Sequence, residues 1–281
     1  MNQPESNIKD MFANKEAIDY PACLSVVVPV YNEAGTLGEV VNKLLSVPCL
    51  LEIIIVDDCS TDGTGELARE LAEIHTQVSL IRHERNAGKT AALKTGFALT
   101  KGQIVIVQDA DLEYDPIDIP GVIRPILEGH ADVVFGSRFL VRRAARVLYF
   151  YHYLANKFLT FLSNALTNLN MTDIETGYKA FRGDIIRNMV IVSSGFGFEV
   201  EVVAKIAKLK IAIYEVPISY YGRTYAEGKK VLMKDGLIAI WLVIRFNLFS
   251  SLRSSFRELP ELHYKPSRAS SATPEVPGFR E

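Results

Sequence analysis

The chain has 281 residues, 48% of them hydrophobic and 23% charged, and a formal net charge of -2. This length suffices for one large α/β domain with a buried core, and the composition is that of a globular protein rather than a disordered one. The nearly balanced charge gives no electrostatic reason to expect a nucleic-acid partner. The three cysteines show neither CxxC spacing nor the density of a disulfide scaffold, which indicates a reducing, cytoplasmic location.

The sequence predicts neither an export signal nor a membrane-spanning helix. The N-terminal arm, residues 1–22, begins MNQPESNIKDMF, which is polar and mixed in charge, whereas a secretory signal has a basic start followed by an apolar run. The most apolar late stretch, Gly236–Ile244, has about half of the ~20 residues that a spanning helix needs.

Strand and helix patterns alternate along the first part of the chain. Leu24–Val30 and Glu52–Asp58 are apolar at nearly every position, which is typical of strands buried on both faces of a parallel sheet. Between them, Glu39–Leu45 has apolar residues at helical spacing, so the three segments predict a βαβ unit. A helix, a strand, a helix and a strand are predicted next, over Gly63–His75, Val78–Arg82, Lys89–Thr100 and Gln103–Gln108. These elements predict a Rossmann-like, doubly wound, mostly parallel sheet with helices on both faces.

The later part of the chain continues this pattern. Val133–Arg138 predicts a further strand, and Val147–Leu166 predicts a helix rich in aromatic residues. In the strand predicted over Ile211–Tyr220, Pro217 indicates a sheet edge or a strand end. We expect one domain over 23–230, a C-terminal amphipathic helix over 231–257 and a flexible tail over 258–281.

Two aspartates, Asp109 and Asp111, directly follow the predicted strand Gln103–Gln108. Ligands bind at the carboxyl ends of the strands in doubly wound sheets, and two carboxylates one residue apart can reach one hard cation together. Mg²⁺ or Mn²⁺ would complete its coordination with diphosphate oxygens and act as a Lewis acid on the leaving group. The alternative reading of an isolated Asp-x-Asp is a solvated loop, and its position after a buried strand favours the metal site.

A second acidic pair, Asp57 and Asp58, ends the preceding buried strand. One of these carboxylates can accept a hydrogen bond from a base or a ribose hydroxyl. The turn after the first strand, PVYNEAG, lacks the GxGxxG pattern of dinucleotide-binding proteins, so hydride transfer is disfavoured. Asp62, just beyond the pair, is better explained as a helix cap than as a catalytic residue.

Seven sequence blocks, taken in order, are specific enough to indicate a family. They are VVVPVYNE, IIIVDDCSTDGT, RNAGKTAALKTGF, VQDADLEYDP, VVFGSRF, DIETGYKAFR and YYGRTYAEGKK. Together they span Leu24–Lys230, and as an ordered set they resemble glycosyltransferase family 2, whose members have a GT-A fold. Within this family the blocks are most similar to the branch of dolichyl- and polyprenyl-phosphate sugar synthases. The resemblance implies a glycosyltransferase with a nucleotide-sugar donor.

The resemblance also implies roles for individual donor-site residues. Contacts to the base and ribose map onto Pro29, Tyr31, Glu33 and Asp58. The diphosphate and metal ligands map onto Asp109 and Asp111, with Gln108 nearby and Glu113 as a further candidate ligand. Contacts to the donor phosphates map onto Lys89 at a helix start and onto Arg223 and Lys229 or Lys230 in a late loop that could close over the donor.

On the acceptor side, the sequence has four arginines, Arg138, Arg142, Arg143 and Arg146. The forked guanidinium group of arginine matches the spacing of phosphate oxygens. The resemblance implies that the arginine of the GSR motif and a later arginine bind a lipid phosphate, so we assign Arg138 and Arg146 to the acceptor phosphate. A solvated face is the alternative for the others. The aromatic helix that follows could sit in a lipid interface, although core packing better explains most of its side chains.

The kind of acceptor decides whether the reaction needs a general base. A phosphate monoester is already largely ionised near neutrality, because its second pKa is about 6, so it needs positioning more than deprotonation. An alcohol acceptor would need a base, for which the candidates are Asp173, Glu175, Glu199 and Glu201. The resemblance implies single displacement with inversion at the anomeric carbon.

The sequence therefore predicts an inverting, metal-dependent transfer of a hexose from a UDP- or GDP-sugar to polyprenyl or dolichyl phosphate. A sugar, glycolipid or protein hydroxyl is the alternative acceptor, in cell-surface polysaccharide or glycoconjugate synthesis. A non-catalytic nucleotide-sugar binding module is disfavoured because Asp109, Asp111 and Arg138 are all present. Many relatives carry a C-terminal membrane anchor, and the sequence predicts none here. We expect an amphipathic face over Val231–Leu252 to attach the protein to the membrane surface instead, on the cytoplasmic side. The sequence indicates neither the sugar, the base nor the oligomeric state.

Overall fold

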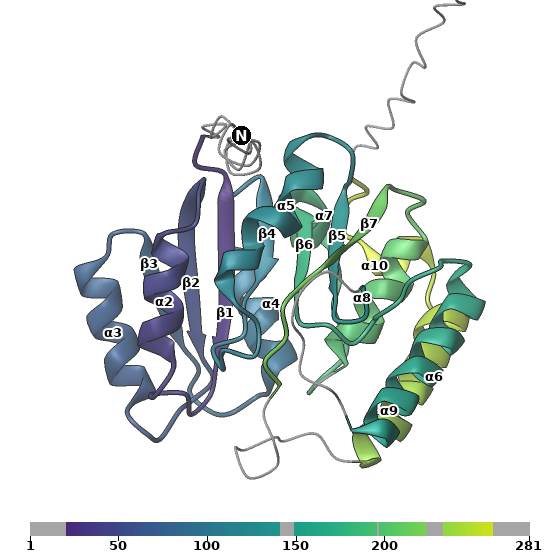
Figure 1. The fold of residues 1–281 in the computed structure, drawn as a ribbon, viewed down its shortest axis with the longest axis horizontal. Helices are drawn as coiled ribbons and strands as arrows, with labels where there is room; N and C mark the ends of the chain where they lie inside the picture. The colour runs from purple at the N-terminus through teal and green to yellow at the C-terminus, as the bar shows by residue number, and fades with distance from the viewer. Residues whose placement is uncertain (1–20, 141–148, 196, 223–232, 261–281) are drawn as a thin grey trace, which may run out of the picture.

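The computed structural model describes residues 21–140, 149–195, 197–222 and 233–260, without the side chains of residues 233–235. The described part of the chain is built around one seven-stranded sheet with the strand order β3-β2-β1-β4-β6-β5-β7 (Figure 1). Its strands are β1 Leu24–Val30, β2 Leu50–Asp57, β3 Val78–Arg82, β4 Ile104–Val107, β5 Val133–Ser137, β6 Lys179–Arg182 and β7 Ile213–Pro217.

Helices cover both faces of this sheet, as Figure 1 shows. They are α2 Leu37–Leu45, α3 Thr64–Ile74, α4 Lys89–Leu99, the 3₁₀ turn η1 Pro116–Asp118, α5 Ile119–Leu127, α6 Phe150–Thr167, α7 Gly183–Asn188, α8 Phe198–Ala207, α9 Met233–Leu248 and α10 Leu252–Ser255. Helices α2, α3 and α5 pack on one face, and α4, α7 and α8 pack on the other. Helices α6 and α9 lie side by side against α8.

The alternation of side chains along β1 explains why the strand is apolar at nearly every position. Val26 and Val28 belong to the hydrophobic core beneath α2, whereas Val27 belongs to the core beneath α4. A strand buried on both faces is therefore apolar on both sides except where a polar group is hydrogen-bonded, as Ser25 is to Glu52.

The sheet is parallel except at β6, which runs antiparallel to both β4 and β5. The carboxyl ends of β1, β2, β4 and β5 therefore lie at one edge of the sheet. The sequence did not predict β6, because its four residues begin with Lys179 and end with Arg182 and so contain no apolar run. Pro217 ends β7, the outermost strand, where a missing N–H costs no ladder hydrogen bond.

These observations confirm the predicted mostly parallel α/β sheet with helices on both faces. The predicted elements differ from the observed ones by up to three residues at their ends. Residues 198–202 alternate apolar and acidic side chains, yet they begin helix α8. In the segment 231–257, which we predicted as a single helix, the structure has α9 and α10. The proposed division at residue 230 stays a prediction. Residues 1–20 of the predicted arm 1–22 and residues 261–281 of the predicted tail 258–281 lie outside the described residues.

Candidate active site

The loops that follow β1 and β2 are joined by hydrogen bonds at the carboxyl edge of the sheet. The backbone N–H of Asn32 donates to Ser60 Oγ at 2.9 Å, and the N–H of Glu33 donates to Thr64 Oγ1 at 2.9 Å. These contacts hold the first sequence block in place and leave Tyr31 38% exposed at the edge. Pro29, inside β1, is only partly buried.

The two aspartates at the end of β2 have different partners. Asp57 accepts from the N–H of Ser60 and pairs with Arg82, so it stabilises the turn. Asp58 is almost fully buried and accepts hydrogen bonds from the N–H groups of Ala87, at 3.0 Å, and Gly88, at 2.7 Å. It therefore fixes the loop that leads into α4. Its predicted contact with the base or ribose stays a prediction.

His83 is a further partner of Asp58 that the sequence did not suggest. Its Nδ1 lies 2.7 Å from Asp58 Oδ1, and its Nε2 lies 3.0 Å from Thr95 Oγ1. A lone histidine after a short strand carries no recognisable motif, so only the fold brings it to Asp58. Through His83, the end of β2 is connected to the middle of helix α4.

Lys89 lies between two carboxylates. Its Nζ is 2.8 Å from Asp109 Oδ1 and 3.3 Å from Glu199 Oε1. Burial by itself would lower the pKa of Lys89, but the charges of Asp109 and Glu199 outweigh it and raise the pKa above its usual range. The sequence-predicted residues Lys89, Asp109 and Glu199 are thus brought together from α4, the end of β4 and α8.

Asp111 and Glu113 follow in the same loop. Asp111 Oδ1 accepts from the N–H of Glu113 at 3.1 Å, and Glu113 Oε2 accepts from the Tyr220 hydroxyl at 3.2 Å. Burial and the neighbouring charges of Asp109 and Glu113 raise the pKa of Asp111 to about 7. A site that crowds carboxylates in this way fits a divalent cation, which would stabilise their ionised forms. In the described residues, however, no group of three or more His, Cys, Asp or Glu side chains already forms a metal site.

Gln108 shapes this loop from inside the core. Its Nε2 donates to the backbone oxygens of Asp109 and Tyr114, and its Oε1 accepts from the Tyr178 hydroxyl. The Tyr114 ring stacks on Tyr178 with 5.1 Å between the ring centroids. Gly177 lies beside the loop, where an added Cβ would come within 2.5 Å of Asp109 Oδ2. The amide of Gln108 therefore positions Asp109, and the glycine gives the Asp109 carboxylate room.

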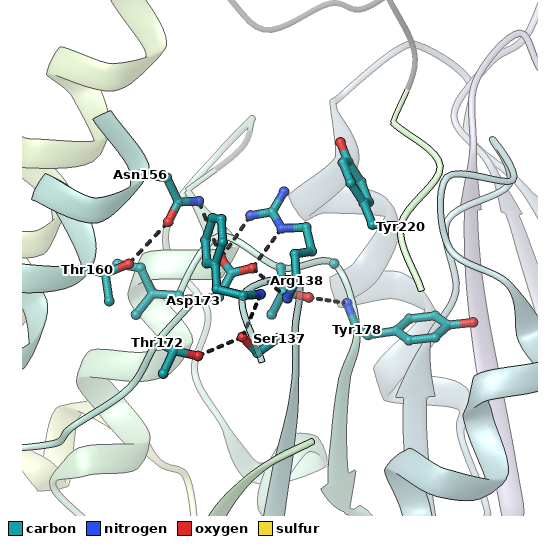
Figure 2. A network of polar contacts seen from close by, with 12 residues as sticks. Ser137, Arg138, Asn156, Thr160, Thr172, Asp173, Tyr178 and Tyr220 are labelled. Atoms are coloured by element: carbon teal, nitrogen blue, oxygen red, sulfur yellow. Dashed lines mark hydrogen bonds and ion pairs between the residues drawn. The ribbon is translucent and has the colours of Figure 1, made fainter. Parts of the chain in front are cut away.

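Arg138, directly after β5, is held by a carboxylate (Figure 2). Its Nε donates to Asp173 Oδ2 at 2.7 Å, and its Nη2 donates to Asp173 Oδ1 at 2.8 Å. Burial alone would raise the pKa of Asp173, but the guanidinium and its hydrogen bonds outweigh it and lower that pKa below its usual value. The Asp173 carboxylate is thus engaged by Arg138, which disfavours the base role that we considered for it.

Two further residues support this pair, and the sequence did not identify either of them for it. Asn156 of α6 donates to Asp173 Oδ1 at 3.3 Å. Glu215 of β7 accepts from the N–H groups of Thr172, at 2.9 Å, and Asp173, at 3.2 Å. Because Glu215 is 42 residues from Asp173 in the chain, no local pattern predicts this contact.

Of the other base candidates, Glu199 and Glu201 are buried and Glu175 is partly buried. Glu201 accepts from the N–H groups of Val192 and Ser193 and pairs with Lys205, so it stabilises the start of α8. Burial, together with the charge of Glu199, raises the pKa of Glu175 to about 7. Oε1 of Glu175 and Oε2 of Glu199 have no hydrogen-bond partner in the described structure. Arg142, Arg143, Arg146, Arg223, Lys229 and Lys230 lie outside the described residues.

The mixed sheet, with its loops at the carboxyl edge, is that of the GT-A fold, which similar solved structures share. The synthase of glucosyl-3-phosphoglycerate from Mycobacterium tuberculosis, in a structure with Mn²⁺, UDP-glucose and phosphoglyceric acid, superposes with a TM-score of 0.63 at 20% identity, over 89% of this chain and 87% of that one. Mannosyl-3-phosphoglycerate synthase from Rubrobacter xylanophilus superposes with a TM-score of 0.61 at 19% identity, over 80% of this chain and 72% of that one.

Sequence comparison identifies the family. The model of glycosyl transferase family 2 matches residues 25–190, and the chain belongs to this family of enzymes. An undecaprenyl-phosphate mannosyltransferase of Micrococcus luteus is 30% identical, over 79% of this chain and 93% of that protein. A dolichol-phosphate mannosyltransferase of Pyrococcus furiosus is 31% identical over 73% of this chain, which covers 58% of that protein. The family and the branch predicted from the sequence blocks are confirmed.

Proposed function

We propose that the protein transfers a hexose from a nucleotide sugar to the phosphate of a polyprenyl or dolichyl phosphate, with inversion. The observation that carries this proposal is the buried Arg138–Asp173 pair at the same edge of the sheet as Asp109. A guanidinium fixed in this way offers its remaining N–H groups to a phosphate without first losing side-chain entropy. The relatives named for undecaprenyl and dolichol phosphate support a lipid phosphate as its target.

For the donor, we assign base and ribose contacts to Pro29, Tyr31, Glu33 and Asp58. Tyr31 is exposed at the edge of the sheet, as a stacking residue for a base would be. Asp58 contributes mainly through the loop that it holds, because its carboxylate already accepts from Ala87 and Gly88. We assign Arg223 and Lys229, together with Lys89, to the donor phosphates. A structural neighbour solved with Mn²⁺ and UDP-glucose supports a nucleotide sugar as the donor.

We propose that Asp109, Asp111 and Glu113 hold Mg²⁺ or Mn²⁺ together with the donor diphosphate. Carboxylate oxygens are the ligands that both ions prefer, and the raised pKa of Asp111 reflects crowded negative charge that a cation would relieve. Such an ion would neutralise charge on the departing nucleoside diphosphate. Lys89, already beside Asp109, adds a second positive charge at this position.

A phosphate acceptor suits this site because the nucleophile arrives ionised. Near neutrality a phosphate monoester carries between one and two negative charges, since its second pKa is about 6. Arg138 would bind and orient it, and Asp173 would hold Arg138. No base is then needed, which agrees with the engagement of Asp173 by Arg138 and of Glu201 by Lys205. Glu175 and Glu199 would serve as bases only with an alcohol acceptor.

The test is a transfer assay with the full chain, Mg²⁺ or Mn²⁺, a panel of UDP- and GDP-sugars, and undecaprenyl phosphate in detergent. We expect a sugar-phospholipid product from undecaprenyl phosphate and none from undecaprenol, the matched acceptor without the phosphate. Transfer to undecaprenol or to soluble sugars, with none to undecaprenyl phosphate, would replace this proposal with the hydroxyl-acceptor alternative.

We further propose that α6 and α9 rest on the surface of the membrane that holds the acceptor, on its cytoplasmic side. Each helix has one stripe of large apolar side chains that are more than half exposed: Phe150, Leu154, Phe158 and Phe161 on α6, and Leu237, Trp241 and Leu248 on α9. The opposite sides of both helices pack into the core through Leu159 and through Val243 and Phe246. No described helix is long and apolar enough to cross a membrane.

The position of α6 supports a lipid surface as the partner. Asn156 of α6 reaches Asp173, so the helix that carries one apolar stripe also contacts the proposed acceptor site. A lipid phosphate lies at the headgroup level, the depth at which exposed aromatic side chains insert. The stripes would therefore bring Arg138 to the depth of its substrate.

We predict that Phe158→Ser combined with Trp241→Ser reduces binding to phosphatidylglycerol-containing vesicles by at least about tenfold, because each large side chain contributes ~1.5–3 kcal/mol when buried. Ile74→Ser is the control, since Ile74 is 71% exposed but lies on α3, away from both stripes. Vesicle flotation measures the binding. Equal flotation of the wild type and the double variant, or no flotation of the wild type, would exclude this surface.

A further inference from the structure

Helix α6 directs a lysine, Lys157, toward the loop that carries Asp173. Its Nζ donates to the backbone oxygen of Thr172 at 3.3 Å, one residue before Asp173. The same ammonium lies 4.3 Å from the centre of the Phe139 ring and 5.7 Å from that of Tyr153. Lys157 is partly buried, and these contacts hold its charged end near one place.

Phe139 brings this ammonium close to Arg138. The guanidinium carbon of Arg138 lies 5.8 Å from the centre of the same Phe139 ring. Two cations from different elements, one after β5 and one on α6, thus lie around a single aromatic side chain. Both cations contact one ring, and Asp173 balances the charge of Arg138 alone, so the arrangement keeps a net positive charge that suits an anion.

The charges of the two cations are balanced differently. Arg138 has Asp173 as a bidentate partner. Within the part of the chain whose side chains the structure describes, no carboxylate lies within ion-pair distance of Lys157. A lysine ammonium has three N–H donors, and among the described residues only one oxygen accepts from Lys157, at the long distance of 3.3 Å. Lys157 therefore retains both charge and donors for a ligand.

We propose that Lys157 is a second contact for the acceptor phosphate and shares that phosphate with Arg138. This inference rests on the proposed function, because it assigns Lys157 to the same acceptor. A phosphate monoester in its dianionic form has three charged oxygens, and one guanidinium satisfies only part of them. Lys157 supplies a point charge from the side of α6, while Phe139 and Tyr153 hold its side chain in place. Inorganic phosphate and the phosphate group of a lipid would make the same contacts with Lys157 and Arg138.

The test compares Lys157→Met with Lys157→Arg in transfer to undecaprenyl phosphate by the full chain. A hydrogen bond to a charged group contributes ~1.5–3 kcal/mol, so Lys157→Met should raise the KM for undecaprenyl phosphate by about 10- to 100-fold. The KM for the nucleotide sugar, measured by donor hydrolysis without acceptor, should stay within about twofold. Lys157→Arg should recover most of the loss because it keeps the charge. Lys157→Gln replaces Lys157→Met if the methionine variant does not fold.

Lys208→Met is the matched control, because Lys208 also donates to a backbone oxygen, that of Asn247 at 3.2 Å, but from the far end of α8. We expect it to leave both KM values unchanged.

Inhibition by inorganic phosphate distinguishes free phosphate from a lipid phosphate as the ligand of Lys157. Weaker inhibition of Lys157→Met than of the wild type shows that Lys157 recognises the phosphate group alone. Unchanged inhibition together with a raised KM for undecaprenyl phosphate shows that Lys157 recognises only the lipid-bound phosphate. An unchanged KM for undecaprenyl phosphate in Lys157→Met overturns the inference. A wild type that makes no sugar-phospholipid overturns the proposed function instead.

Discussion

Arg138→Met is expected to lower kcat/KM for transfer to undecaprenyl phosphate by about 1,000-fold, because it removes a fixed cation at the proposed acceptor phosphate. It also leaves Asp173, whose side chain is fully buried, without its charged partner. An uncompensated buried charge costs ~3–5 kcal/mol, so the free energy of unfolding should fall by this amount. Steady-state kinetics and urea unfolding measure the two effects separately.

A double variant separates function from stability at this site. Arg138→Met with Asp173→Leu removes both charges, and replacing a buried pair by apolar residues is often nearly neutral. We expect it to regain most of the stability and none of the transfer activity. Arg182→Met is the control, since Arg182 also pairs with aspartates, Asp132 and Asp184, but at the opposite edge of the sheet. Recovery of activity in the double variant would show that Arg138 acts only by stabilising the fold.

Asp111→Asn is expected to lower transfer by about 100- to 1,000-fold with every acceptor, because it removes one carboxylate from the proposed metal and diphosphate site. The neutral amide also removes repulsion among Asp109, Asp111 and Glu113. The thermal midpoint without metal should therefore stay the same or rise. Activity, the thermal midpoint and calorimetric binding of Mn²⁺ in the presence of UDP are the three measurements.

Asp115→Asn is the matched control for Asp111→Asn. Asp115 lies in the same loop, but its carboxylate caps the turn η1 by accepting from the N–H of Ile117 and pairs with Lys43. We expect Asp115→Asn to cost a little stability and to leave Mn²⁺ binding and transfer nearly unchanged. Unaltered Mn²⁺ binding and turnover in folded Asp111→Asn would remove Asp111 from the metal site.

Local patterns predicted the strands that contribute most to the sheet. The β-branched runs of β1 and β2 and the QIVIVQ run around β4 are visible because a strand buried on both faces must be apolar along its whole length. The acidic pairs after β2 and β4 were recognised as site candidates because parallel strands end at a common edge. Strand β6 and helix α8 were not predicted, because Lys179 and the alternating Glu199 and Glu201 obscure their periodicity.

The sequence by itself determined the α/β class and the family and supplied the candidate residues of the site, since these depend on periodicity and on ordered short motifs. Only the tertiary structure decided their partners. Asp58 proved to hold the loop at Ala87 and Gly88, Asp173 to hold Arg138, and Glu201 to pair with Lys205. Lys157 gained significance only beside Phe139. Such pairings join residues from separate elements, or depend on which side of a helix faces the core, and no spacing within a single segment encodes them.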